Sequence, residues 1–156
     1  MIDINALVTG MVALLQTIPE LVEEMNGDIG RINAYTYRYP EQMSLEEAVT
    51  DLTTPDLLVA HTSTSPGSDG DIPCWRHEVT VFVRAKAKDA SQPPAYWNIH
   101  RLLWKGIPGD SGAPMGQTEI IPDCYAMEMP AMMRQQDSSG LDYFSIQTAF
   151  NEKGDD

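Results

Sequence analysis

The sequence contains little cysteine and no long apolar run. Its two cysteines, Cys74 and Cys124, are too few for the disulfide framework of a small secreted domain. We expect two partly buried thiols, with one bridge between neighbouring strands as the alternative. No apolar stretch approaches the roughly 20 residues that a membrane-spanning helix needs. No basic flank precedes the N-terminal apolar segment, as it would in a signal peptide. We therefore expect no membrane contact.

Basic residues are also scarce. The chain of 156 residues has 10 Lys and Arg against 23 Asp and Glu, which gives a net charge of -13 at pH 7. Residues 1–60 carry -8 and residues 107–156 carry -7, whereas residues 61–106 carry +2. Because an acidic surface repels phosphate, binding of nucleic acid by bulk charge is disfavoured. A basic contact surface is expected only in the middle segment.

The motifs that mark many enzymes and metal proteins are missing as well. The chain has no Walker loop, dinucleotide-binding glycine motif or calcium loop, and the acidic segment Asp69-Gly-Asp71 is too short to be one. Its three histidines and two cysteines have neither zinc-finger nor zinc-ribbon spacing. We therefore predict no metal, no cofactor and no catalytic residue.

One segment does resemble an active-site sequence. Residues 109–114, Gly-Asp-Ser-Gly-Ala-Pro, are similar to the residues around the nucleophilic serine of chymotrypsin-like proteases. Such a protease also needs a histidine and an aspartate earlier in the chain, and neither His61 nor His77 has the expected sequence context. We predict a Gly/Pro turn here and a Ser111 that is not a nucleophile. A small serine hydrolase using Ser111 is the remote alternative.

Apolar residues with helical spacing predict two main helices. The first covers residues 4–25 and is interrupted by Pro19, so we expect a helix that kinks or restarts near Thr17 and stops at Asn26-Gly27. The second opens after Ser91 and runs through Lys105. Between them, residues 44–47 (Ser-Leu-Glu-Glu) form a capping box that predicts a short helix.

Alternation of apolar and polar residues predicts strands at 31–39, 57–62, 75–88, 124–134 and 141–150. Residues 63–73 and 107–122 are rich in Gly and Pro and are predicted to be mobile loops. We expect the strands on either side of the first loop to pair antiparallel. The pattern predicts one α+β domain over residues 1–156, with two main helices packed on a mixed, mainly antiparallel sheet.

This order of elements resembles that of the tail terminator, or tail completion, proteins of long-tailed bacteriophages, or of a related neck protein. Four segments carry the resemblance, namely the end of the first helix at 18–25, the strand at 77–84, the helix at 96–103 and the closing strand that ends after Phe150. The resemblance covers nearly the whole chain. It rests on element order, not on a catalytic motif, and it implies a tail-terminator-like fold.

The resemblance also implies a function that involves no chemistry. Proteins of this family form a ring, usually a hexamer, at the head-proximal end of the tail tube. The ring stops tube polymerisation and joins the tail to the head. The expected partners are other copies of the chain, the tail tube protein and a neck or head-completion protein, while DNA passes through without specific binding. The expected location is the virion, and the host cytoplasm during assembly. A head-completion or neck adaptor protein without a closed ring is the alternative.

The charge pattern suggests one subunit contact. Residues 75–88 place Arg84, Lys86 and Lys88 on one face of the predicted strand. We expect this basic edge to face acidic surface, from residues 1–60 or 107–156, of a neighbouring subunit, since head-to-tail contacts close rings. The alternative is a solvated strand face.

Further interface residues are expected near the first loop. Polar loops and exposed aromatic side chains often serve as contact sites, which favours Asp69, Asp71 and Trp75. Trp97 and Trp104 are also candidates, with a core position as the alternative for each tryptophan.

Overall fold

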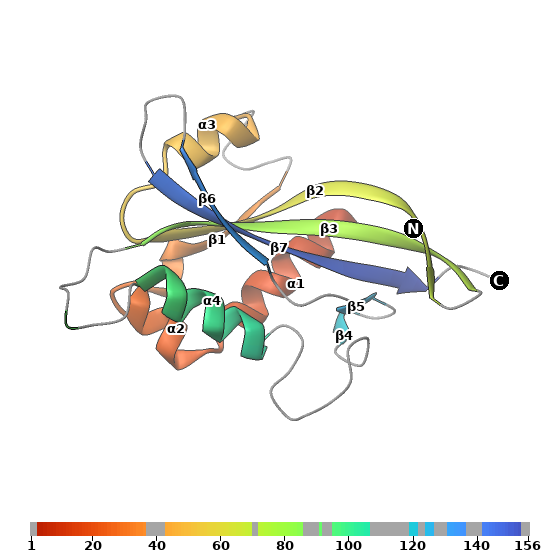
Figure 1. Ribbon diagram of the computed structural model, residues 1–156, viewed down its shortest axis with the longest axis horizontal. Coiled ribbons are helices and arrows are strands. Elements are labelled where there is room, and N and C mark those ends of the chain that lie inside the picture. The colour runs from red at the N-terminus through yellow and green to blue at the C-terminus, as the bar shows by residue number, and fades with distance from the viewer. Residues whose placement is uncertain are drawn as a thin grey trace.

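A computed structural model gives the fold of the chain (Figure 1). It describes residues 3–36, 43–69, 72–85, 91, 95–106, 119–121, 124–126, 131–136 and 142–153. The helices within these ranges are α1 (Ile4–Gln16), α2 (Pro19–Glu24), the short 3-10 helix η1 (Ile29–Arg31), α3 (Leu45–Thr50) and α4 (Ala95–Gly106). The strands are β1 (Ile32–Tyr35), β2 (Asp56–Asp69), β3 (Ile72–Arg84), β4 (Glu119–Ile121), β5 (Cys124–Ala126), β6 (Ala131–Gln136) and β7 (Asp142–Lys153).

The seven strands form one sheet in the order β1-β2-β3-β7-β5-β4, and β6 also pairs with β7. β1 runs parallel to β2, and every other pair is antiparallel. On the side of β7 away from β3, β6 pairs with residues 142–147 and β5 pairs with residues 150–152. The predicted α+β fold with a mixed, mainly antiparallel sheet is confirmed.

The N-terminal apolar stripe forms two helices because Pro19 has no backbone N–H to continue the first one. α1 begins at the N-cap Asp3, whose side chain accepts a hydrogen bond of 2.9 Å from the backbone N–H of Asn5. α2 has Pro19 at its first position. The chain then leaves the helix through Asn26 and Gly27, whose φ angles of 60° and 72° lie in the left-handed region. The predicted break and stop are both confirmed.

Helices cover both faces of the sheet, but unequally (Figure 1). α1, α2 and α4 bury the larger apolar cluster against one face, and its bulkiest fully buried members include Leu7, Met11, Leu15, Leu103 and Phe150. α3 covers a smaller area of the other face, where Ala48 and Val49 pack with Leu58, Ala60 and Phe82. Ser44 caps α3 by accepting from the backbone N–H of Glu47, as the capping box predicted.

The β2–β3 hairpin is longer than the sequence indicated. Residues 63–73 were expected to form a loop, but β2 continues to Asp69, which pairs with Ile72 at the start of β3. A register shift between His61 and Ser63 marks a bulge, after which the pairing resumes. Strands pair through backbone N–H and C=O groups, which Ser, Thr and Gly also have, so these residues can continue an edge strand. The predicted antiparallel pairing of 57–62 with 75–88 is confirmed for the described residues.

Two other predictions need correction. The expected strand 124–134 is two strands, β5 and β6, on either side of residues 127–130. Within the expected loop 107–122, residues 119–121 form β4, and the rest lies outside the described residues. None of the helices described in the chain combines the length and apolar character needed to cross a membrane.

Candidate functional site

The outer half of the hairpin, defined as residues 62–69 of β2 and 72–77 of β3, is one candidate surface. β1 pairs only with residues 57–60 of β2, so the described structure places no strand against the outer edge of β2 beyond Ala60. Pro66 is exposed on this stretch, and Trp75 on β3 is 37% exposed. Residues 62–77 include Asp69, Asp71 and Arg76, a net charge of -1. The hairpin therefore has an open edge and a small negative net charge in its sequence.

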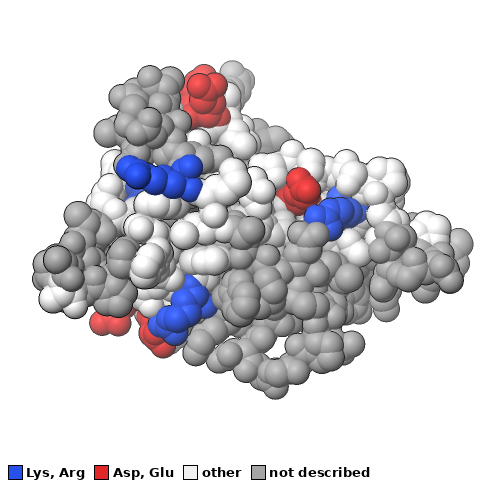
Figure 2. All heavy atoms as spheres, viewed as in Figure 1, with Lys and Arg blue, Asp and Glu red and all other residues white. Residues whose placement is uncertain are grey.

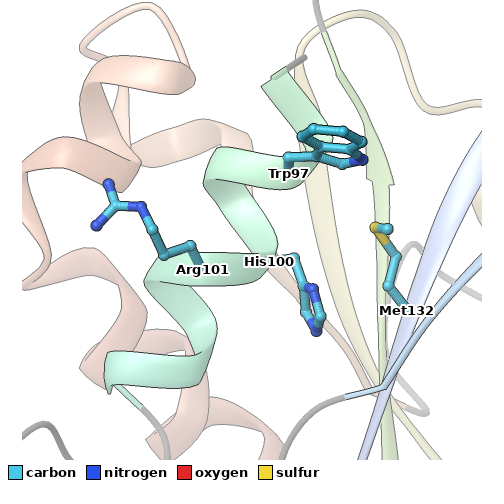
Figure 3. Close-up of a pocket in the computed structure, with 4 residues that line it drawn as sticks. All are labelled: Trp97, His100, Arg101 and Met132. Carbon is cyan, nitrogen blue, oxygen red and sulfur yellow. The ribbon is translucent and has the colours of Figure 1, made fainter. Parts of the chain in front are cut away.

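A second candidate surface lies between α4 and β6 (Figure 3). A depression of about 380 Å³ is lined by Trp97, His100, Arg101 and Met132. Trp97 is 57% exposed and lies opposite Met132 across the depression. Arg101 turns its guanidinium toward α2, where its Nη2 lies 3.3 Å from Oε2 of Glu20. The accessible part of the depression is thus formed mainly by an aromatic ring, an imidazole and a thioether.

The backbone edge of β6 continues this surface. Within the described structure β6 pairs only with β7, so the opposite edge of β6 has no strand partner. Met133 is 48% exposed, and Arg134 is exposed as well. We call Trp97, His100, Arg101, Met132, Met133 and Arg134 the α4–β6 surface. Trp, Met and Arg are the residue types enriched at protein interfaces, and an open apolar strand edge readily pairs with another chain.

Contacts beneath the α4–β6 surface hold α4 in place. The ring of Tyr96 on α4 stacks on Phe144 of β7, with centroids 4.1 Å apart. Asn98 donates a hydrogen bond of 2.9 Å to Glu24 on α2. Ile99, Leu102 and Leu103 are buried in the main core. Because this inner stripe fixes the rotation of α4, Trp97 is held outward by packing of the rest of the helix.

A buried chain of polar side chains ties together β2, β3 and β7, and we call it the polar chain. His77 is 0% exposed, and its Nε2 lies 2.8 Å from Oε2 of Glu152. Its Nδ1 lies 2.8 Å from Oγ1 of Thr64, which in turn lies 2.7 Å from Nε2 of His61. When Nε2–H of His77 donates to the Glu152 carboxylate, neutral His77 accepts at Nδ1 from the Thr64 hydroxyl, and the Thr64 oxygen can accept from Nε2–H of His61.

The polar chain contains the residue types of a hydroxyl–imidazole–carboxylate relay, but its geometry favours a structural role. Relay catalysis requires a substrate to reach the nucleophile and its base. His77 is fully buried, and Glu152 is 5% exposed. Three hydrogen bonds instead satisfy groups that would be costly to bury alone, and they join three strands at the point where the hairpin leaves the main body.

His61 gives the polar chain a pH dependence. Burial lowers the pKa of His61 below its ordinary value of 6.5, nearness to His77 lowers this pKa further, and a hydrogen bond with the backbone of Ser63 opposes the shift. A histidine with a lowered pKa favours folding while it is neutral. Below pH 6.5 the unfolded chain takes up the proton first, so this contribution to stability falls with pH until the pKa of the folded state is passed.

We expect the free energy of unfolding of the wild type to decline relative to that of His61→Gln as the pH falls below 6.5. Urea denaturation of both proteins at several values between about pH 8 and pH 5 measures this difference. Because the two proteins share all their other titratable groups, the difference between their free energies of unfolding isolates the contribution of His61. If the wild type keeps the same stability relative to His61→Gln at every pH, or becomes relatively more stable in acid, then the pKa of His61 is not lowered.

Arg84 does not lie on an exposed face, as the predicted basic edge requires of it. Arg84 is only 5% exposed, because α3 and Tyr143 cover its face of the sheet. Its Nη2 lies 3.4 Å from the backbone oxygen of Val49, and its guanidinium lies 5.7 Å from the centre of the Tyr143 ring. The sequence pattern put Arg84 on the polar face of a strand, but that face is also packed at this end. Arg84 is therefore not available for a subunit contact.

The other predicted residues are distributed as follows. Asp69 and Trp75 both lie on the outer half of the hairpin, where Asp69 pairs with Ile72 and Trp75 pairs with Pro66. Arg84 is at the opposite end of β3. Lys86, Lys88, Asp71 and Ser111, and the side chain of Trp104, lie outside the described residues, so the predictions about them stay predictions. On the face drawn in Figure 2, the described charges are scattered and form no continuous basic patch.

Sequence reasoning named Trp97 as an interface candidate but missed the rest of the α4–β6 surface and the polar chain. The exposure of Trp97 agrees with its place outside the inner stripe of the amphipathic α4. Two polar residues at inward positions of their strands, His77 among valines and Glu152 two residues beyond Phe150, could have indicated a buried pair. Among the residues that the structure describes, no three His, Cys, Asp or Glu side chains are grouped as metal ligands would be.

Comparison with known proteins adds no identification. No protein-family model matches the chain, and a search of curated proteins found no match.

Proposed function

We propose that this protein is a structural assembly protein that forms a homo-oligomeric ring, of the kind that ends the tail tube of a long-tailed bacteriophage and joins tail to head. One observation carries the proposal. The described sheet has unlike open edges on its two sides, the outer half of β2 next to β1 on one side and β6 next to β4 on the other. A molecule with two unlike contact surfaces on opposite sides assembles head to tail.

Head-to-tail contacts have two outcomes. They produce a ring when the rotation between neighbours closes, and an open filament when it does not. The resemblance in element order favours the ring, with six as the expected number of subunits. The net charge of -13 is compatible with a channel through which DNA slides without being held. In this proposal the ring contacts the tail tube protein on one side and a neck or head-completion protein on the other, in the virion.

Replacing Met133 by lysine tests the role of the β6 edge. A charge on an edge strand opposes pairing with another strand, so we expect Met133→Lys to weaken self-association by about tenfold or more. Ile29→Lys is the matched control, because Ile29 is 54% exposed on η1 and Met133 is 48% exposed on β6. Sedimentation velocity of both variants measures the association, and thermal melts check the fold.

The outcome separates the proposal from its alternatives. If Met133→Lys and Ile29→Lys assemble equally well, the β6 edge is not a subunit contact. A protein that is monomeric even as the wild type would support a head-completion or neck adaptor protein that uses this fold without a ring.

A further inference from the structure

We propose that the α4–β6 surface receives the outer half of the β2–β3 hairpin of a second copy of this chain. This inference rests on the proposed ring and names the two surfaces that meet in it. The contact has three components, which are backbone pairing between two open strand edges, apolar packing around Trp97, and attraction between a weakly acidic hairpin and a basic surface.

The backbone component follows from the topology of the sheet. The outer edge of β2 beyond Ala60 and the outer edge of β6 both lack a strand partner in the described structure. They lie on opposite sides of the same sheet, so one molecule cannot pair them with each other. A second copy can, and the pairing continues the sheet from one subunit to the next. Pro66 and the bulge after His61 interrupt the β2 edge, which limits pairing to short stretches and disfavours indiscriminate association.

The apolar component comes from the depression between α4 and β6. Trp97 is 57% exposed and faces Met132 across a volume of about 380 Å³, while Met133 is exposed on the opposite face of β6. This space suits a few side chains of an edge strand better than a whole domain. The hairpin brings an aromatic side chain of its own, since Trp75 is 37% exposed there. Aromatic residues held in a shallow depression are typical binding hot spots.

The charge component selects a second copy of this chain as the occupant. α4 and β6 contain Arg101, Arg134 and Lys105 but no Asp or Glu. The hairpin sequence from residue 62 to residue 77 has two aspartates and one arginine, a net charge of -1 against +3 for α4 and β6. Arg134 is exposed, and it lies on the same face of β6 as Met132 because residues two apart in a strand share a face. The two surfaces are thus complementary in charge, and they are unlike surfaces, as head-to-tail assembly requires.

Two variants, each defective in one surface, test the contact. The first, Trp97→Ala with Arg134→Gln, removes the anchor and the exposed cation of the α4–β6 surface. The second, Pro66→Lys with Asp69→Lys, makes the hairpin basic. Each is expected to weaken self-association by about 30-fold or more, because loss of a hot-spot residue has effects of this size. Ile29→Ala is the control for the loss of an exposed apolar side chain, and Glu23→Lys with Ile29→Lys is the control for the change in charge.

Mixing the two variants gives the decisive result. The first variant keeps an intact hairpin and the second keeps an intact α4–β6 surface, so one productive contact remains between them. We expect each variant alone to be monomeric and an equimolar mixture to form one-to-one dimers and nothing larger, as measured by native mass spectrometry. Circular dichroism and thermal melts confirm that each variant is folded.

The possible outcomes also distinguish this inference from the proposed function. If the wild type assembles and both variants assemble equally well, this contact is wrong while the ring stands. If both variants are monomeric but their mixture forms no dimer, the two surfaces do not bind each other, and this pairing is again wrong. If the wild type itself is monomeric at micromolar concentration, the proposed ring is wrong and this contact with it.

Discussion

Replacing His77 with alanine is expected to lower the free energy of unfolding by about 2–5 kcal/mol, the range found when a large buried side chain is removed and its hydrogen bonds are lost. His77 is 0% exposed and bonds to Glu152 on one side and to Thr64 on the other. Alanine removes the hydrogen bonds that the imidazole makes with Glu152 and Thr64, and it opens a cavity between three strands. Urea denaturation at neutral pH measures the loss.

Two comparisons show whether the polar chain is responsible for this loss. His61→Ala removes the half-buried end of the chain, and we expect it to cost about 1 kcal/mol. A double-mutant cycle between His77→Ala and Glu152→Gln should give a coupling energy well above the experimental error, because the two side chains lie 2.8 Å apart. Additive effects, or a stability for His77→Ala within about 0.5 kcal/mol of the wild type, would show that the polar chain does not hold the hairpin.

Replacing Arg84 with glutamate is expected to have a similarly large effect, a loss of about 3–5 kcal/mol. Arg84 is 5% exposed beneath α3, with its guanidinium near the ring of Tyr143 and the backbone oxygen of Val49. A carboxylate here would be buried against the negative face of an aromatic ring and a carbonyl oxygen, both of which favour a cation. Thermal and urea denaturation would show the loss directly.

Arg84→Met separates the charge from the volume of this side chain. Methionine keeps most of the length of arginine without a buried charge, so we expect a clearly smaller loss of stability than for Arg84→Glu. If Arg84→Glu melts like the wild type and instead weakens self-association, then Arg84 is at a subunit contact, as the sequence pattern first suggested, and the buried position is wrong.

The sequence predicted the elements whose signals are local. The break at Pro19, the stop at Asn26-Gly27 and the capping box at Ser44 each depend on a few adjacent residues, and each is present. The alternating strands 57–62 and 75–88 likewise indicated the antiparallel pair. These features suffice for the α+β class, because periodicity and turn chemistry determine most of it.

The features that sequence reasoning missed depend on residues far apart in the chain. Arg84 was placed on an exposed face because its strand alternates, but α3 packs over that face from 35 residues away, as the Arg84–Val49 contact shows. The pairing of His77 with Glu152 joins residues 75 apart and has no local signature. The extension of β2 through residues 63–69 depends on β3 as a partner, whereas its Ser, Pro and Gly content alone indicates a loop.

The candidate surfaces were only partly predictable for the same reason. Trp75 and Asp69 were expected at an interface from their residue types, and both lie on the open hairpin. The α4–β6 surface joins residues from two elements that are not adjacent in the chain, and within the described structure β6 has a strand partner, β7, on one side only. No pattern within one segment could have shown that edge.

The mass of the assembled protein in solution tests the central claim most directly. Sedimentation velocity with native mass spectrometry on the whole chain, over a dilution series in the micromolar range and at two salt concentrations, measures it. A closed ring predicts one discrete species at a whole multiple of 17.3 kDa, with six copies as the expected number, that persists on dilution and appears as an annulus in electron micrographs. A mass of 17.3 kDa throughout the series, or an open ladder of growing oligomers, would contradict the account.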